Sequence, residues 1–434
     1  MADDTVRKRR QGAKRWLAAG AAAAALAVIA LVAVQEGRRW LAQSDPVQHV
    51  DAAAGQIELG RYLATVADCA ACHTAHGGAP LAGGRPLQTP FGAIHSTNIT
   101  PDPDHGIGRY TAEEFHRALT RGTARDGHLL YPAMPYTSYR GISRQDSDAM
   151  YAYLMNVPAV AQPNRENGLS FPFNLRFGLY FWNFLFAGDG QAQARQDDAP
   201  ALLRGKYLVD TLGHCAECHS PRGALGQTDR RRPLAGNNTL ARFAAPDITR
   251  AGLLARGWTE DELRRYLRTG VSAVAVASGE MLEAVNLSTS RWRESDIDAA
   301  VSYLFASGPQ AAPPAVALAE AGRPMEQELP GRSHYLNLCA GCHAANGRGV
   351  PHVAPGLVGN SSVTDADPHN LLVSILDGLP AHELPGLERM QAMPGFARTL
   401  SDEDISALGN WLRVEYGKRP ASVTPGDVAR LRQR

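Results

Sequence analysis

The 434-residue sequence has no cysteine outside three short motifs, little excess charge and no NAD- or ATP-binding motif. All six cysteines belong to CxxCH motifs, so none remains for a disulfide between domains or for a free thiol. A net charge of +1 gives neither a basic field for nucleic acid nor a strong acidic field. The missing NAD and ATP motifs agree with a chain that works outside the cytoplasm. At roughly 150 residues per domain, the length predicts about three domains.

The three CxxCH motifs read DCAACH, HCAECH and LCAGCH. Two cysteines separated by two residues and followed by histidine are the attachment pattern of c-type haem. Each thiol adds to one vinyl group of the porphyrin, and the imidazole ligates the iron. A redox disulfide needs no trailing histidine, and three CxxC pairs cannot be matched into closed zinc sites without one left over. The motifs therefore predict three covalent haem c groups, attached at Cys69/Cys72, Cys215/Cys218 and Cys339/Cys342, with His73, His219 and His343 on the irons.

One long apolar run lies near the N-terminus. Residues 1–15 contain six basic side chains, and residues 16–34 contain no charge. As a helix, this run would span roughly 28 Å, about the hydrocarbon thickness of a bilayer. Basic residues before the span keep that end cytoplasmic, which places the rest on the periplasmic side of the cell inner membrane. A cleaved signal peptide is the alternative, although VAVQEGRRW at the end of the run is a poor cleavage site.

One helical segment recurs three times without gaps. SRQDSDAMYAYL, RESDIDAAVSYL and SDEDISALGNWL share an aspartate at the fourth position, an aromatic near the end and a final leucine. Their apolar residues recur at helical spacing, which predicts three amphipathic helices. Ser143 and Ser401 would cap two of them, and Thr111 and Thr259 would cap two earlier helices.

Each repeat also opens with a related element: GRYL at Gly60, GKYL at Gly205 and SHYL at Ser333. The small first residue is expected to let the opening helix cross the closing helix at close range. The sequence thus predicts an all-α fold, with three tandem cytochrome c-like domains behind an N-terminal transmembrane helix. The predicted boundaries are 1–15 for a basic cytoplasmic end, 16–34 for the anchor, 52–160, 201–308 and 329–418 for the domains, 161–200 for an aromatic-rich linker, 309–328 for a second linker and 419–434 for a tail.

A methionine is predicted as the second axial ligand of each iron. Met134, Met281 and Met393 follow the three motif histidines by 61, 62 and 50 residues and precede the closing helices. A thioether suits low-spin iron and raises its potential. One such methionine alone would indicate core packing, but three at equivalent places favour ligation. Met281 lacks the proline that follows the other two, and Met390 is an alternative to Met393.

Longer stretches carry a resemblance to a known family. They include GRYLATVADCAACHTAHGG, STNITPDPDHGIGRYTAEEFHRAL, LYPAMPYTSY, GKYLVDTLGHCAECHSPRG and VTPGDVARLR. With these stretches the chain resembles the three-haem cytochrome c subunit of bacterial membrane-bound dehydrogenases of the aldehyde, alcohol and gluconate type. The resemblance implies an electron-transfer subunit that accepts electrons from a periplasmic catalytic subunit and passes them to membrane ubiquinone. It also implies the same attachment cysteines, proximal histidines and distal methionines as the motifs do.

Residues 170–186, SFPFNLRFGLYFWNFLF, form what we call the aromatic segment; it holds eight of the chain's thirty aromatic residues. This density predicts an exposed apolar element that docks a partner subunit or lies in the membrane interface, and a helix strapped over the joined domains is the alternative. The pattern FPFN-x-R…WN-x-LF, with DGLPAHELPGLERMQAMPGF, most resembles cytochromes that accompany molybdopterin, iron–sulfur aldehyde-type dehydrogenases. A flavin or pyrroloquinoline quinone subunit is the alternative partner.

Three six-coordinate haems would leave no open iron for oxygen or peroxide, so the chain alone is not expected to act on an organic substrate. Two other functions stay open. A haem peroxidase or oxidase would need one iron without its methionine. A free-standing carrier would need neither the anchor nor the aromatic segment.

Overall fold

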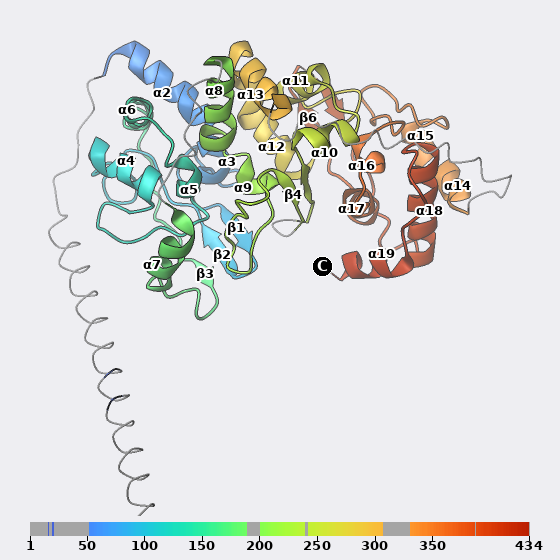
Figure 1. Cartoon of the computed structure of the whole chain (residues 1–434), viewed down its shortest axis with the longest axis horizontal. Coiled ribbons are helices and arrows are strands. Elements are labelled where there is room, and N and C mark those ends of the chain that lie inside the picture. Colours follow the sequence, from blue (N-terminus) through green and yellow to red (C-terminus); the bar gives the residue numbers. More distant parts are fainter. Residues whose placement is uncertain are drawn as a thin grey trace, which may run out of the picture.

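The computed structural model describes residues 16, 20, 52–188, 200–238, 242–306, 330–386 and 388–433. These residues form an elongated body in which three helical units follow one another in chain order (Figure 1). No helix among them is long and apolar enough to span a bilayer. Of the predicted anchor only Trp16 and Gly20 are among the described residues, and the predicted linker 309–328 lies outside them.

The first unit begins with a long helix that leads into the first CxxCH motif, and a second long helix closes it. Between them lie a hairpin and two shorter helices. After the closing helix, the chain adds a short strand and the helical part of the aromatic segment. The elements are α2 (Ala54–Val66), α3 (Cys69–His73), β1 (Pro86–Thr89), β2 (Gly92–His95), α4 (Ala112–Arg121), α5 (Tyr136–Tyr139), α6 (Arg144–Leu154), β3 (Gly168–Leu169), α7 (Gly178–Trp182) and the π-helical η1 (Asn183–Ala187).

The second unit repeats this order, whereas in the third unit the hairpin follows the shorter helices and directly precedes the closing helix. In both, the opening helix continues through a π-helical stretch to the CxxCH motif. The second unit comprises α8 (Pro200–Lys206), η2 (Tyr207–Leu212), α9 (Ala216–His219), β4 (Ala235–Asn237), β5 (Ala245–Asp247), α10 (Arg250–Ala255), α11 (Glu260–Thr269), α12 (Gly279–Leu287), η3 (Thr289–Arg291) and α13 (Glu294–Ala306). The third comprises α14 (Gly331–His334), η4 (Tyr335–Cys339), α15 (Ala340–His343), α16 (Ser361–Thr364), α17 (His369–Asp377), β6 (His382–Leu384), β7 (Glu388–Met390), α18 (Asp402–Glu415) and α19 (Pro425–Arg432).

The four predicted helix caps are confirmed. The side chains of Thr111, Ser143, Thr259 and Ser401 each accept a hydrogen bond from the backbone N–H three residues later. At Thr111 and Ser401 the side chain of the acidic residue three positions later also accepts a hydrogen bond from the backbone N–H of the cap residue, which completes a capping box. These bonds satisfy N–H groups that have no partner inside the helix.

The all-α expectation is incomplete in the loops. Strands β1 and β2, β4 and β5, and β6 and β7 form antiparallel pairs, and β3 extends the first of these sheets. Each strand has only two to four residues, so the fold remains mainly helical. The loops turn back on themselves, and strand pairing then satisfies backbone groups that have no helical partner.

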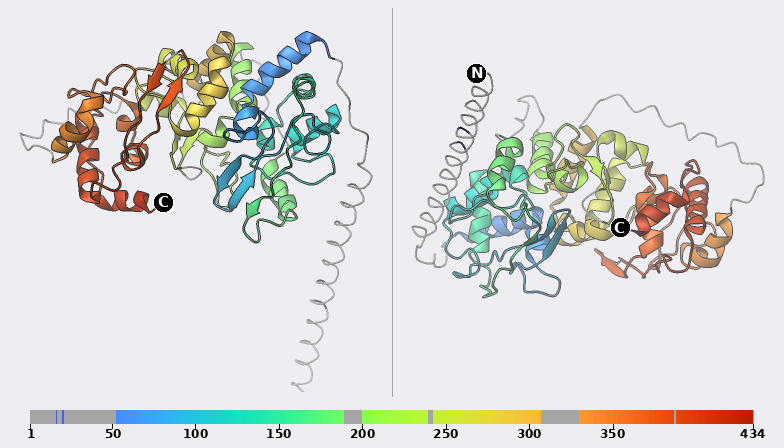
Figure 2. Two further views of the ribbon diagram at one scale, coloured as in Figure 1. Left: turned by 180° about the vertical axis from the view of Figure 1, so that it is seen from behind. Right: turned by 90° about the horizontal axis from the view of Figure 1, so that it is seen from below.

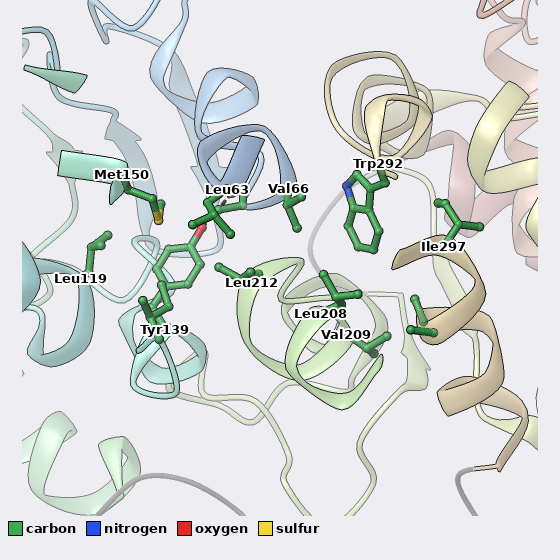
Figure 3. Close-up of a cluster of buried hydrophobic side chains, with 14 of the residues drawn as sticks. Leu63, Val66, Leu119, Tyr139, Met150, Leu208, Val209, Leu212, Trp292 and Ile297 are labelled. Atoms are coloured by element: carbon green, nitrogen blue, oxygen red, sulfur yellow. Dashed lines mark hydrogen bonds between the residues drawn. The ribbon is translucent and has the colours of Figure 1, made fainter. Parts of the chain in front are cut away.

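The first two units share one continuous hydrophobic core. Leu63 and Val66 of α2 approach Leu208 and Leu212 of η2 in the middle of the cluster (Figure 3). All four are at most 1% exposed. The third unit has its own core, built around α17 and α18. A small cluster of Ala277, Val285, Leu384 and Met390, which we call the junction cluster, joins the second unit to the third.

The opening and closing helices of each unit cross in contact. A Cβ added at Gly60 or Gly205 would come closer than 3.0 Å to the carbonyl oxygen of Ala149 or Ala299, so neither position has room for a side chain. In the third unit the equivalent position is Gly331, which lies against Ala407. The alignment of Ser333 with the two glycines was therefore wrong by two residues. The first motif cysteine follows this glycine by 9 residues in the first unit, 10 in the second and 8 in the third, and the stretch is π-helical in the second and third units.

Candidate functional site

The three CxxCH motifs occupy equivalent places, each on a short helix directly after the opening helix. The first motif forms α3, with Asp68 before it in a left-handed conformation at φ 52°. In the second, Cys215 precedes α9, which contains Cys218 and His219. In the third, Cys339 ends η4, and α15 carries Cys342 and His343. In each unit the two cysteines and the histidine thus lie within five residues of helical backbone, as attachment to one porphyrin edge requires.

The three motif histidines are oriented in the same way. The Nδ1–H of His73 donates to the carbonyl of Thr97 at 2.6 Å. His219 and His343 donate from Nδ1 to the carbonyls of Pro246 and Pro355, at 2.7 and 2.9 Å. A carbonyl can only accept, so the bond fixes the proton on Nδ1 and leaves the lone pair on Nε2. Burial lowers the pKa of all three imidazoles, which keeps them neutral and able to ligate a metal.

The thiols do not have the properties of a redox CxxC pair. Desolvation raises the pKa of Cys69 and of Cys215 to about 12 and that of Cys339 to about 11. Disulfide oxidoreductases instead lower the pKa of the attacking cysteine, because the thiolate is the nucleophile. These apolar surroundings suit sulfurs that end as thioethers.

The structure places the three predicted methionines near the closing helices but in different settings. Met134 lies before α5 and packs, like Cys69, against the core of the first two units. Met393 packs, like Cys339, against the third core, and two backbone hydrogen bonds of 2.9 and 2.8 Å pair it with Leu379. Met281 lies in the first turn of α12 and contacts the junction cluster. Ligation by all three stays a prediction.

Met390, the alternative to Met393, belongs to the junction cluster. It is 8% exposed and lies with Ala277, Val285 and Leu384, so its side chain fills the contact between the second and third units. Met393 stays the predicted ligand of the third unit.

The residues present fit haem c. Two thiols and a neutral imidazole with a free Nε2 lone pair are the donor set that covalent haem requires, and the chain presents it three times. The second unit adds a polar group suited to a propionate. The indole Nε1–H of Trp258 is buried without a hydrogen-bond partner among the described residues, and indole N–H is a donor only. When bound, each haem would supply a one-electron redox centre.

His214, which sequence reasoning left without a role, links the first two motifs. Its Nε2–H donates to the carbonyl of Ala67 at 3.3 Å. Its ring packs against the ring of Tyr139 in a T-shaped arrangement, with the ring centroids 5.5 Å apart. The hydroxyl of Tyr139 donates to the same carbonyl at 2.8 Å. The residue just before the second motif therefore contacts the residues just before the first. A histidine next to a CxxCH motif gives no signal in the sequence that it reaches into another unit.

Comparisons with known proteins agree with this site. The cytochrome c family profile matches residues 57–158 and 329–414. The gluconate 2-dehydrogenase cytochrome c subunit of Pantoea cypripedii is 36% identical over 395 residues, covering 87% of this chain and 89% of the relative. The alcohol dehydrogenase (quinone) cytochrome c subunit of Gluconacetobacter polyoxogenes is 35% identical over 414 residues, 90% of this chain and 87% of the relative.

A third relative is much longer than this chain. A nicotinate dehydrogenase subunit of Pseudomonas putida is 38% identical over 385 residues, which cover 87% of this chain but 32% of the relative. The first two relatives match over nearly their whole length, and the attachment geometry recurs in all three units. The chain belongs to the family of cytochrome c subunits of dehydrogenases, and its function is electron transfer.

Proposed function

We propose that this chain carries three haem c groups, accepts electrons from the catalytic subunit of a periplasmic dehydrogenase and passes them to ubiquinone in the cell inner membrane. The observation that carries the proposal is the threefold recurrence of one attachment helix with a histidine held by a backbone carbonyl. The quinone acceptor is supported by the name of the alcohol dehydrogenase relative. The periplasmic location rests on the basic residues that precede the apolar run 16–34.

The chain's own residues favour transfer between the first two sites. His214 and Tyr139 hold the two attachment segments against each other through the carbonyl of Ala67. The surrounding core excludes water, and a rigid apolar setting lowers the reorganisation that a change of charge demands. The backbone carbonyls on Nδ1 make the three imidazoles more basic ligands, and a methionine opposite would raise the potential.

Replacing Met134 with alanine should change the first haem alone. Loss of the thioether should lower the midpoint potential of one haem by roughly 0.1 V or more, a fraction of the ~0.8 V over which axial ligands tune haem potentials. The same haem should become high-spin and bind carbon monoxide when reduced. A spectroscopic redox titration of the purified full chain measures all three changes.

The control is Met155→Leu, because Met155 is 4% exposed in the shared core and is not a candidate ligand. It should leave all midpoints and the spin state unchanged. If Met134→Ala behaves like this control, Met134 is not a ligand. If the unaltered protein already binds carbon monoxide, one iron is open and a haem enzyme becomes the better proposal.

We infer further that the catalytic partner is a molybdopterin enzyme with iron–sulfur clusters, of the aldehyde-oxidising type. The sequence patterns of the aromatic segment and of the third unit support this choice over a flavin or pyrroloquinoline quinone subunit. The similarity to a nicotinate dehydrogenase subunit of Pseudomonas putida shows that related sequences are not confined to the alcohol and gluconate dehydrogenases.

Metal analysis of the native complex, purified in mild detergent, tests the partner. We expect about one molybdenum for every three haem irons, together with a large copurifying subunit. Haem iron without molybdenum would exclude the molybdopterin partner and would point to a flavin or quinone-cofactor dehydrogenase. The electron-transfer assignment would stand in either case.

A further inference from the structure

The aromatic segment forms an exposed apolar surface. Phe184, Phe171, Phe181 and Leu185 are 86, 78, 61 and 61% exposed, and Leu175, Phe177, Phe173 and Tyr180 are each at least 36% exposed. Helix α7 and the neighbouring β3 project from the lower edge of the first unit in Figure 1, and they project from the same edge when the molecule is seen from behind (Figure 2). The aromatic segment therefore lies at a projecting edge of the first unit.

The segment is held in this position by its polar groups. Trp182 donates from Nε1 to the carbonyl of Leu225 at 3.0 Å, and Asn183 accepts from the hydroxyl of Tyr136 at 2.7 Å. Arg176 donates to the carbonyl of Leu129 at 2.7 Å. At the other end, Phe173 packs on Phe91 with ring centroids 4.2 Å apart. These contacts join the segment to Leu129 and Tyr136 of the first unit and to Leu225 of the second, so it lies across both units, as the strap alternative expects. Phe171, Phe181 and Phe184 nevertheless stay exposed.

Cationic side chains border the surface. Within the segment itself Arg176 is the only charged residue. At its C-terminal end lies a loop with the consecutive arginines 230–232, all exposed. Arg230 donates to the carbonyl of Ala187, the last residue of η1, at 2.9 Å. Arg232 is paired with Asp229, whereas Arg231, the exposed residue next to Arg230, adds a second positive charge to this loop.

This combination fits a lipid surface better than a protein. A protein interface carries about one hydrogen bond per 100–200 Å², yet Arg176, Trp182 and Asn183 already bond inward. Phenylalanine and leucine need no such partner when they enter the boundary between headgroups and acyl chains. Arginines at the margin attract anionic headgroups, and the projecting position of the segment lets it reach a bilayer.

We propose that the aromatic segment, with Arg230 and Arg231 at its margin, is a membrane-binding surface that places Phe171, Phe181 and Phe184 at the acyl boundary of an anionic phospholipid bilayer. The proposal rests on the proposed function, because it holds the first two units beside the membrane in which the quinone dissolves. It is separate from the predicted anchor, since it concerns a described surface more than one hundred residues further along the chain.

Photolabelling of the full chain tests this surface whether or not an anchor is present. The complex is reconstituted into vesicles with about one third anionic phospholipid, doped with a phospholipid that carries a photoreactive diazirine in its acyl chain. Peptide mapping should find the label in residues 170–187. The variant F171S/F181S/F184S should reduce label there by at least about tenfold, because each phenylalanine loses its apolar burial. R230Q/R231Q should reduce it by about fivefold per arginine in anionic vesicles only.

The matched control is L254S/V358S, which removes two exposed apolar side chains, 38 and 52% exposed, that lie outside the surface. It should leave the label unchanged, and all variants should keep the haem spectrum. Absence of label in 170–187 overturns the proposal. If hydrogen exchange in that unlabelled segment also slows when the catalytic partner is added, the surface docks that partner instead. Haem reduction by the catalytic subunit is measured separately, so failure of electron transfer is distinguished from failure of membrane binding.

Discussion

Replacing Gly60 with alanine should prevent the first unit from folding normally. Gly60 lies where α2 crosses α6, and an added Cβ would come within 3.0 Å of both the carbonyl oxygen and the carbonyl carbon of Ala149. Neither atom is the end of a flexible side chain, so the helices themselves would have to separate. Overpacking a core typically costs 1–3 kcal/mol, and we expect about 3 kcal/mol or more here because backbone must move. Urea unfolding of the purified chain, followed by circular dichroism, measures the loss.

The same helix provides a matched control. Gly55 is also a glycine of α2, and a Cβ added there would meet nothing within 4 Å. Gly55→Ala should therefore stabilise the chain by about 0.5–1 kcal/mol, because alanine loses less backbone entropy in a helix. The two glycine-to-alanine substitutions should thus change the free energy of unfolding in opposite directions. The comparison distinguishes the effect of the close helix crossing from that of helix propensity. Equal effects at the two positions would show that the close crossing does not constrain the sequence.

The sequence predicted the glycine contacts in two units out of three, and the exception has a physical cause. Aligning the third unit by its YL dipeptide selected Ser333, whereas the close crossing occurs at Gly331. The tyrosine of the YL dipeptide follows the crossing glycine by two residues in the first two units and by four in the third, where Gly331 and Tyr335 are separated by the rest of α14. A repeat in sequence letters records which residues are alike, but it does not record which position of the helix makes the close contact.

The CxxCH motifs and helix caps were predictable because they depend on neighbours in sequence. Contacts between units could not be predicted in this way. The tyrosine of each opening element in the first two units bonds the fourth-position aspartate of the other unit's closing helix. Tyr62 donates to Asp296 at 2.5 Å, and Tyr207 donates to Asp146 at 2.5 Å. Both residue types were visible as repeats, but their exchange between units follows from how α2 packs against η2. The exchange is reciprocal, so the two units are related as a pseudo-symmetric pair.

The reciprocal pairs predict the second large effect. Asp296→Ala should destabilise the shared body of the first two units by about 2–4 kcal/mol. Asp296 also accepts from Arg204 at 2.8 and 2.7 Å, so its removal leaves both Tyr62 and Arg204 without their carboxylate. Removing one partner of a fully buried ion pair costs about 3–5 kcal/mol. The loss expected here is smaller because the Arg204 side chain is 35% exposed. Urea unfolding monitored by the circular dichroism of helices measures this change.

Asp298→Ala is the control for that substitution. Asp298 lies on the same helix, its side chain is 55% exposed and it pairs with Arg264. Exposed ion pairs contribute about 0–1 kcal/mol, so this variant should stay close to the unaltered chain. If the two substitutions lower the free energy of unfolding by the same amount, the hydrogen-bonded pairs between the first two units do not stabilise their association.

The pH dependence of stability follows from the same carboxylate. Burial tends to raise the pKa of Asp296, but hydrogen bonds from Arg204 and Tyr62 outweigh it and hold the pKa below its ordinary value of 3.8. Because the pKa of Asp296 is lower in the folded protein than in the unfolded chain, the ionised carboxylate stabilises the fold fully at pH values above the unfolded pKa. This stabilisation is lost as the pH falls through the folded pKa. The free energy of unfolding should therefore fall from pH 5 to pH 3 more steeply in the unaltered chain than in Asp296→Ala. Burial and the bond to Asp296 raise the pKa of Tyr62 to about 12, so its hydroxyl remains a donor throughout this range. Parallel acid profiles for the two proteins would mean that Asp296 is not ionised in the contact.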